Sequence, residues 1–187
     1  MFLLPIDDDL ALWLLEHRHA EPLFARVEEN RDELGRWLPW VETTRSPDDV
    51  RAFIERGLAR FARGDGFETG IALHGRLVGC LGLHYVSRPE GCTEIGFWLA
   101  REAQGAGVMS RAVAGLLPHL YDDLDLRRVE IRCNPANEDA RAVPERLGFR
   151  EEGVLRQVGF SDGQPYDHVV YALLRDEWKE RFDEATH

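Results

Sequence analysis

The 187-residue sequence contains a single lysine, Lys179, beside 22 arginines. A phosphate-binding loop of the Walker type needs a lysine directly after its second glycine, so this shortage excludes that class of nucleotide site. Acidic residues outnumber basic ones by 34 to 23, which gives a net charge of −11. Broad nucleic-acid binding requires cationic groups against the phosphates, so we expect no nucleic-acid partner. A basic protein or a cationic amine fits this charge better.

Cysteines and long apolar runs are also scarce. The three cysteines, Cys80, Cys92 and Cys133, have no metal-ligand spacing, and the seven histidines form no cluster, so we expect neither a disulfide framework nor a metal site. Pro5 and three aspartates interrupt the apolar start, which predicts a first strand rather than a signal peptide or membrane helix. We therefore expect a cytoplasmic protein that does not enter a membrane, with residues 1–187 forming one domain.

Turn and capping residues divide the chain into strands and helices. Ser46 and Pro47 predict the start of an amphipathic helix, and His74-Gly75 predicts a hairpin. The later elements follow in order: a strand over 92–100, a glycine turn and helix to about residue 120, an alternating strand over 127–134, a helix from Asn137 to Gly148, and a hairpin joined at Asp162-Gly163. This order predicts an α/β fold whose mixed sheet contains a parallel pair linked by the glycine turn and its helix.

The segment "AREAQGAGVMS", residues 100–110, places Gly105 and Gly107 directly before a helix, where unpaired N–H groups attract anions. A dinucleotide is one candidate ligand, because the glycines imitate a dinucleotide-binding fingerprint and Glu130 lies downstream to hold a ribose. The spacing argues against it. Five residues, 100–104, lie between Leu99 and Gly105, whereas in the fingerprint the first glycine follows the strand directly, and Glu130 lies in mid-strand.

The other candidate ligand follows from a resemblance that covers nearly the whole chain. The segments "EIGFWLAREAQGAGVMSRAV" and "RRVEIRCNPANEDARAVPERLGFREEGVLR", together with "RWLPW" and "YDHVVYALL", closely resemble the GNAT superfamily of N-acetyltransferases. Within it they are most similar to the Rim-type branch that acetylates ribosomal-protein N-termini. The resemblance implies the GNAT fold, with a mostly antiparallel central sheet, one parallel strand pair and helices on both faces. It also implies acetyl-CoA as the acyl donor, without a metal.

The resemblance further implies where coenzyme A binds. The pyrophosphate would rest on backbone N–H groups of Gln104, Gly105, Ala106, Gly107, Val108, Met109 and Ser110. The pantetheine would pair like an added strand with the strand before the turn, where a bulge at Gly96 would direct the N–H groups of Phe97, Trp98 and Leu99 to the thioester. Asn134 and Asn137 match positions that contact pantetheine. Glu102, Ala140 and Pro144 depart from the family pattern without removing this backbone cradle.

Acetyl transfer from a thioester to an amine requires few catalytic side chains. An α-amine, with a pKa of about 7.7 to 8.0, is already partly neutral near pH 7 and needs only a modest base before it attacks the thioester. Glu94 is the first candidate for that base, directly or through water, and a salt-bridged strand-end carboxylate is the alternative. Cys133 is a candidate proton donor to the departing thiolate, although its alternation with Val129 and Ile131 also fits a buried core cysteine. His84 fits a surface residue better than a base.

The acceptor side is the least defined part of the sequence. Trp37 and Trp40 either line the acceptor pocket or close the core over a loop, and Asp167 either orders the last hairpin or contacts the acceptor. The leading expectation is acetylation of a protein N-terminus, with a basic ribosomal protein drawn to the acidic surface. Acetylation of a small amine and a non-catalytic acyl-CoA sensor are the alternatives. The sequence also leaves open whether the chain forms a homodimer.

Overall fold

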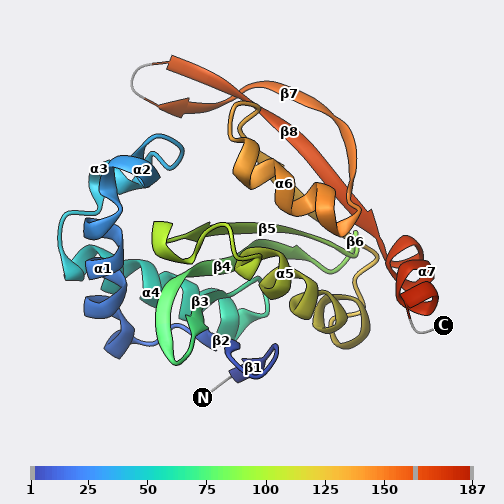
Figure 1. Ribbon diagram of the computed structural model, residues 1–187, viewed down its shortest axis with the longest axis horizontal. Coiled ribbons are helices and arrows are strands. Elements are labelled where there is room, and N and C mark those ends of the chain that lie inside the picture. Colours follow the sequence, from blue (N-terminus) through green and yellow to red (C-terminus); the bar gives the residue numbers. More distant parts are fainter. Residues whose placement is uncertain (1–2, 162–163, 186–187) are drawn as a thin grey trace.

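The computed structural model describes residues 3–161 and 164–185. Its centre is an eight-stranded sheet in the order β1-β2-β3-β4-β5-β6-β8-β7 (Figure 1). The strands are β1 Leu3–Pro5, β2 Leu10–Leu14, β3 Glu68–Leu73, β4 Arg76–Ser87, β5 Cys92–Leu99, β6 Arg128–Cys133, β7 Arg150–Ser161 and β8 Gln164–Leu174. Among these strands, β5 and β6 form the only parallel pair, and every other pair of adjacent strands is antiparallel. The predicted mixed sheet is confirmed.

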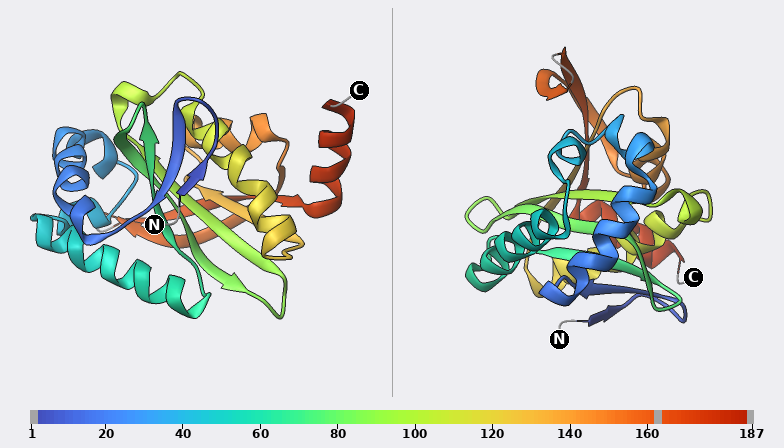
Figure 2. Two further views of the ribbon diagram at one scale, coloured as in Figure 1. Left: turned by 90° about the horizontal axis from the view of Figure 1, so that it is seen from below. Right: turned by 90° about the vertical axis from the view of Figure 1, so that its left-hand side faces the viewer.

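Helices cover both faces of the sheet (Figure 2). They are α1 Ala20–Glu29, α2 Arg31–Gly35, α3 Trp40–Thr43, α4 Pro47–Arg63, α5 Val108–Pro118, α6 Glu138–Leu147 and α7 Arg175–Ala185. The apolar faces of α5 and α6 pack in the main core, which includes Ile95 of β5 and Ile131 of β6. The opposite face carries α1 and α4, whose buried side chains surround Cys80. The alternation of side chains along each strand therefore separates two environments on the two faces.

The start of α4 shows how local chemistry fixes an element. The backbone N–H of Asp49 donates to Ser46 Oγ at 3.3 Å, and Asp49 Oδ2 accepts from the Ser46 N–H at 2.9 Å. This reciprocal capping box satisfies two groups at the helix start, and Pro47 occupies the first helical position. Gly64 ends the helix in the left-handed conformation.

We expect Ser46→Ala to lower the free energy of unfolding by about 1 kcal/mol, because it removes the acceptor for the Asp49 N–H. Urea unfolding followed by circular dichroism measures the change. Ser46→Thr, which keeps a hydroxyl, is the control and should lose much less. Equal stability of the alanine and threonine variants would contradict the role given to this cap.

The structure corrects the expected element order at both ends of the chain. The single strand expected at the start is a hairpin of β1 and β2, closed by Asp7, whose Oδ1 accepts from the N–H groups of Asp9 and Leu10. At the other end, α7 follows β8 and was not expected; it places Trp178 against Tyr121, with ring centroids 5.0 Å apart. The turn expected at residues 162–163 lies outside the described residues.

Candidate active site at the divergence of two parallel strands

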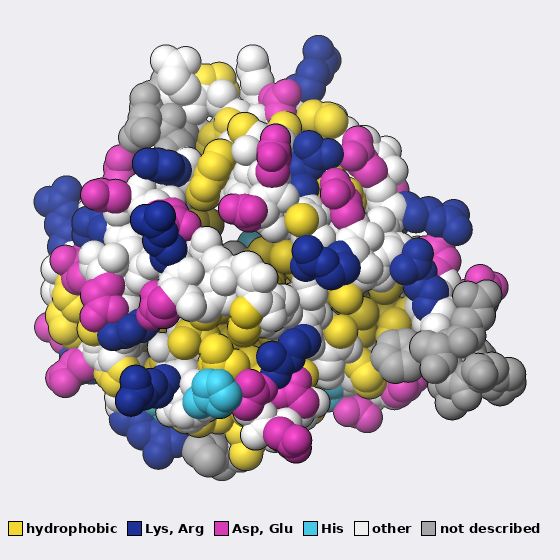
Figure 3. Space-filling view, viewed as in Figure 1, with side chains coloured by type: hydrophobic (Ala, Val, Ile, Leu, Met, Phe, Trp, Pro, Cys, Tyr) yellow, Lys and Arg dark blue, Asp and Glu magenta, His cyan; other side chains and the backbone are white. Residues whose placement is uncertain are grey.

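The parallel strands β5 and β6 pair for only four residues. Cys92–Ile95 lies opposite Arg128–Ile131. Beyond this point β5 continues to Leu99 and β6 to Cys133, but the two strands no longer pair with each other. The second half of β5 still pairs with β4 through its other edge. One edge of β5 and one edge of β6 are therefore open, so an extended ligand can add backbone hydrogen bonds between them. In the space-filling view this face is hollowed near its centre, between α6 and β5 (Figure 3).

The glycine turn lies at the end of the open part of β5. Gly105 and Gly107 have left-handed φ angles of 75° and 73°, and an added Cβ at either position would meet no atom within 4 Å. Both glycines thus face open space at the start of α5. No described residue accepts a hydrogen bond from the backbone N–H groups of residues 105–110. These unpaired donors and the positive end of the helix dipole form an anion site.

Side chains around this turn hold it in place. Gln104 Nε2 donates to the carbonyl of Leu99 at 2.9 Å, which ties the turn back to β5. Ser110 is buried, and its Oγ accepts from Arg146 of α6 at 2.7 Å. Arg146 brings a positive charge to the first turn of α5, and sequence analysis missed it because the arginine lies 36 residues further along the chain.

Asn134 and Asn137, the two candidates for pantetheine contacts, follow directly after β6. Asn134 Oδ1 accepts from the N–H of Ala136 at 2.9 Å, and Asn137 Oδ1 accepts from the N–H of Ala140 at 3.1 Å. Asn137 therefore caps α6, as its position in the sequence predicts. Both residues lie at the open end of β6. Their contact with pantetheine stays a prediction.

The face of the sheet opposite α5 carries the acceptor-side candidates. Phe97 and Leu99 point into the main core with α5, whereas Trp98 packs with the α1–α4 side. Trp40 lies against Trp98, with ring centroids 6.1 Å apart and 37% of Trp40 exposed. Trp37 is half-buried in the turn between α2 and α3. The structure thus brings Trp40 to the thioester strand, while an acceptor contact for either tryptophan stays a prediction.

The bulge expected on β5 at Gly96 is on β4 instead. His84 and Tyr85 of β4 together lie opposite Glu94 of β5, while Gly96 pairs regularly with Gly82. Gly96 has no positive φ; a side chain there would overlap the His84 imidazole, and Nε2 is the nearest atom. The close approach of this ring therefore explains the glycine. Successive N–H groups of a strand point to opposite edges, and the Ala100 N–H donates to the Val78 carbonyl of β4 at 2.7 Å. Of the three predicted thioester contacts, Trp98 therefore directs its N–H to β4, whereas Phe97 and Leu99 direct theirs to the open edge.

Glu94 is 13% exposed and has a partner for each carboxylate oxygen. Oε1 lies 3.1 Å from His84 Nδ1, and Oε2 lies 3.2 Å from Nε of Arg132 on β6. Burial raises the pKa of the Glu94 carboxyl, but the His84 hydrogen bond and the charges of His84 and Arg132 outweigh it, so the pKa is lowered. The same hydrogen bond raises the pKa of His84 above 6.5. The expected base is therefore one half of a carboxylate–imidazole pair.

Two neighbours complete the charge pattern on this face. Arg132 Nη2 donates a hydrogen bond to Glu130 Oε2 of the same strand at 3.0 Å. His168 of β8 lies close enough to feel the charges of Glu94, Arg132 and His84, but burial is the larger effect and lowers the pKa of His168. This cluster could not be predicted from the sequence, because its members come from four strands. Only the pairing of those strands brings them together.

Cys133 lies at the end of β6, beyond the last β5–β6 pair, and is 5% exposed. Burial raises the pKa of its thiol to about 12. A thiol of that pKa is a poor proton donor to a departing thiolate, so its environment favours the packing interpretation.

We expect Cys133→Ala to leave kcat within about twofold of the wild type and to lower the free energy of unfolding by about 1 kcal/mol, the cost of removing one buried heavy atom. Steady-state kinetics and urea unfolding measure the two effects. Cys92→Ala, at the less buried start of β5, is the control. A tenfold fall in kcat for the Cys133 variant alone would instead support its role as a proton donor.

Asp167 has a structural partner. Its Oδ1 accepts from the N–H of Gln157 at 2.8 Å, where β7 bulges and Gln157 takes a positive φ of 53°. This bond orders the β7–β8 hairpin. The neighbouring His168, not Asp167, faces the cluster around Glu94. A direct contact between Asp167 and the acceptor stays a prediction.

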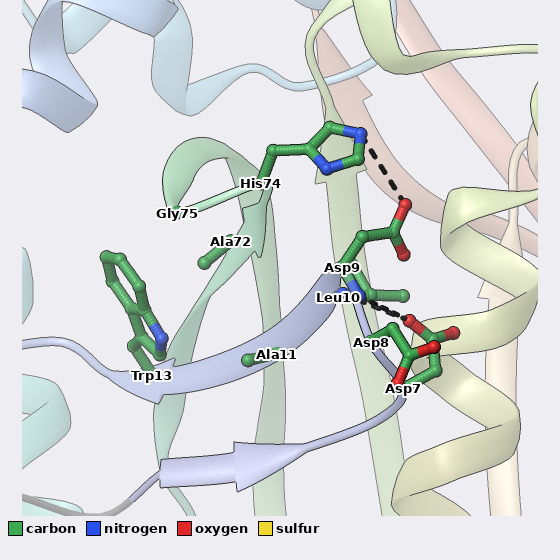
Figure 4. A pocket seen from close by; sticks show the side chains of 9 residues that line it. All are labelled: Asp7, Asp8, Asp9, Leu10, Ala11, Trp13, Ala72, His74 and Gly75. Atoms are coloured by element: carbon green, nitrogen blue, oxygen red, sulfur yellow. Dashed lines mark hydrogen bonds and ion pairs between the residues drawn. The ribbon is translucent and has the colours of Figure 1, made fainter.

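A separate pocket lies between the β1–β2 and β3–β4 turns, lined by Asp7, Asp9, Trp13 and His74 among others (Figure 4). Two of its carboxylates are already paired, since Arg111 of α5 contacts Asp7 and Asp9 and His74 lies 3.5 Å from Asp9. Within the described residues, no group of three side chains suits a metal ion. No helix in this part of the chain is long and apolar enough to cross a membrane.

The open strand edge, the anion site and the sequence agree on the class of protein. The chain belongs to the GNAT acetyltransferases: the family described as "Acetyltransferase (GNAT) domain" matches residues 9–150. It is an N-acetyltransferase that moves an acetyl group from acetyl-CoA to an amine. This confirms the resemblance inferred from the sequence segments and removes the dinucleotide alternative.

Two curated relatives and one solved structure are similar to this chain over nearly its whole length. The putative ribosomal N-acetyltransferase YdaF of Bacillus subtilis (strain 168) is 36% identical over 180 residues, which cover 96% of this chain and 98% of the relative. The ribosomal-protein-serine acetyltransferase of Escherichia coli (strain K12) is 28% identical over 171 residues, covering 91% and 96%. A solved RimL, a ribosomal L7/L12 alpha-N-protein acetyltransferase with coenzyme A in a disulfide to a cysteine, superposes with a TM-score of 0.90 at 26% identity, covering 94% of this chain and 99% of that one.

Proposed function

We propose that this chain acetylates the N-terminal α-amine of a protein, with ribosomal proteins as the first candidates. The observation that carries the proposal is the open edge of β5, which β6 leaves unpaired beyond Ile95. The anion site at α5 lies on one face, and Trp98, Glu94 and His84 lie on the other. The names of the relatives, which act on ribosomal proteins, supply the acceptor class.

The residues fit coenzyme A as the donor. The N–H groups of residues 105–110 would hold its pyrophosphate, and Arg146 adds a positive charge beside them. The open edges of β5 and β6 would take the pantetheine, and the N–H groups of Phe97 and Leu99 on that edge supply candidate donors to the thioester oxygen. When bound, acetyl-CoA supplies the activated acetyl group.

The acceptor side of the site suits a positively charged chain end. Glu94 and Glu130 lie beneath the opening on the Trp98 face, and Trp40 borders it. Arg132 already pairs with both carboxylates, so the attraction for a cationic acceptor comes from the net charge of −11, which would attract a basic protein over a longer range. Exposed aromatic surface beside the opening would pack against the first side chains of an extended peptide.

Thiol release from acetyl-CoA tests this proposal with three acceptor classes: a basic peptide with a free α-amine, the same peptide with a blocked α-amine and a free lysine, and a polyamine. We expect release only with the free α-amine, and mass spectrometry should place one acetyl group on the N-terminus. Release with the polyamine alone would support small-amine acetylation. Tight coenzyme A binding without release by any amine would support an acyl-CoA sensor.

A homodimer stays part of the proposal. The β7–β8 hairpin extends well beyond the rest of the sheet at the top of Figure 1 and exposes Val154, Leu155, Val158 and Phe160. Apolar side chains gathered on one hairpin suit an interface with a second copy of the chain. The mass of the protein in solution, measured by light scattering, tests it.

A further inference from the structure

We propose that His84 takes the proton from the acceptor amine and that Glu94 is the positioning residue that orients His84. This inference rests on the proposed function and replaces the expectation that Glu94 is the base and His84 a surface residue. His84 is 56% exposed at the site, whereas Glu94 beneath it is 13% exposed. The exposed member of the pair is the one that an incoming amine can touch.

Both oxygens of Glu94 are already engaged. Oε1 lies 3.1 Å from His84 Nδ1, and Oε2 lies 3.2 Å from Arg132 Nε. A carboxylate held between an imidazole and a guanidinium is a weak base, because protonation would weaken the hydrogen bond from His84 and the ion pair with Arg132. The hydrogen bond assigns the proton of neutral His84 to Nδ1, since that nitrogen must donate to the carboxylate. Nε2 is then left with the lone pair.

The ring of His84 lies at the place where the reaction would occur. Gly96 is the first residue of β5 after the last β5–β6 pair, at Ile95, and Nε2 is the atom nearest to a side chain placed on Gly96. The basic nitrogen therefore lies over the point where the strands diverge. Phe97 and Leu99, further along β5, carry the candidate thioester contacts on the open edge.

The backbone at His84 is held as firmly as its side chain. The bulge on β4 turns His84 toward Glu94, and Arg60 of α4 donates to the carbonyls of Leu83 and His84 at 3.0 and 2.8 Å. The ionisable groups that face the imidazole are Glu94, Glu68 and Arg60, with His168 and Arg132 beyond. The carboxylates favour the charged imidazole and the cations oppose it.

Proton transfer to His84 precedes the attack on the thioester. The α-ammonium gives one proton to His84 Nε2 and becomes a neutral amine, whose lone pair forms the new N–C bond to the acetyl carbon. The C–S bond breaks, and its electron pair leaves with sulfur. The attacking nitrogen then gives up a second proton to solvent and becomes the amide nitrogen. The thiolate takes up a proton from water, and His84 returns its proton to solvent before the next cycle.

Rates across pH distinguish the two assignments. If His84 is the base, His84→Gln should lower kcat/KM about 100-fold near pH 7, with a smaller loss at pH 9, where the amine is already neutral. Glu94→Gln keeps an acceptor for Nδ1 but removes the charge, so it should stay active at pH 9 and shift the acid limb of the profile to lower pH. Loss of activity at every pH in Glu94→Gln, with His84→Gln near wild type, would overturn the proposal.

A second readout needs no acceptor. The His84 imidazole, followed by NMR in the free protein, should titrate with a pKa above 6.5, and Glu94→Gln should lower it; an unchanged pKa would contradict the pairing. His74→Gln, which removes a histidine beside Asp9 at the β3–β4 turn, is the matched control. Imidazole in the assay should partly restore His84→Ala. If wild type releases no thiol with any amine while the NMR shift holds, the proposed function fails but the His84–Glu94 pairing does not.

Discussion

Gly107→Asp should abolish measurable coenzyme A binding. Gly107 adopts a φ of 73° at the start of α5, and its α-carbon faces open space beside unpaired N–H groups. An aspartate there places bulk and a negative charge where the phosphates would lie. We expect at least about a 100-fold loss of affinity, or about 2.8 kcal/mol, by isothermal titration calorimetry with coenzyme A.

Two control variants separate charge from conformation. Gly107→Asn has nearly the same size and a similar tolerance of the left-handed region, so it should bind more tightly than the aspartate variant. Gly75→Asp puts the same residue at a φ of 74° in the β3–β4 turn, also with open space around it, and should leave the affinity unchanged. Unchanged affinity in Gly107→Asp would remove the cradle assignment. Equal losses at positions 107 and 75 would point to a folding defect.

The sequence predicted those parts of the fold that short-range chemistry determines. The capping box at Ser46, the turn at His74-Gly75 and the glycine end of α6 depend on residues within a few positions of one another. The N-terminal hairpin was missed because Asp7 closes its turn through a side chain, without the usual glycine. The helix α7 was missed because its packing depends on Trp178 meeting Tyr121, which lies 57 residues earlier.

For the same reason, some parts of the site could be predicted from the sequence and others could not. The glycine turn could be recognised because its residues are consecutive, and α5 follows it directly. The pairing of His84 with Glu94 could not, since an extra residue in β4 decides which side chain meets the carboxylate. Without that bulge, a single residue of β4 would lie opposite Glu94, and the pairing beyond it would shift by one residue. A regular pattern of alternating residues gives no warning of an inserted residue.

Gly96→Ala should reduce kcat/KM about 100-fold while leaving coenzyme A affinity unchanged. The added methyl would overlap the His84 imidazole, and the ring, being 56% exposed, can swing outward to relieve the overlap. The ring then leaves Glu94 and the point where β5 and β6 diverge. Removal of a general base of this kind costs about 100-fold or more. Steady-state kinetics measure the loss, and calorimetry with coenzyme A tests whether the donor side is intact.

A double-mutant cycle identifies the cause of that loss. If Gly96→Ala acts by displacing His84, combining it with His84→Gln should cost no more than either change alone, because both remove the same proton acceptor. If the methyl instead disturbs the β5 edge that would hold the pantetheine, the two losses should multiply and coenzyme A affinity should fall. The glycine that was expected to bend β5 would then matter for the donor. In the first outcome it matters because the histidine of a neighbouring strand needs its space.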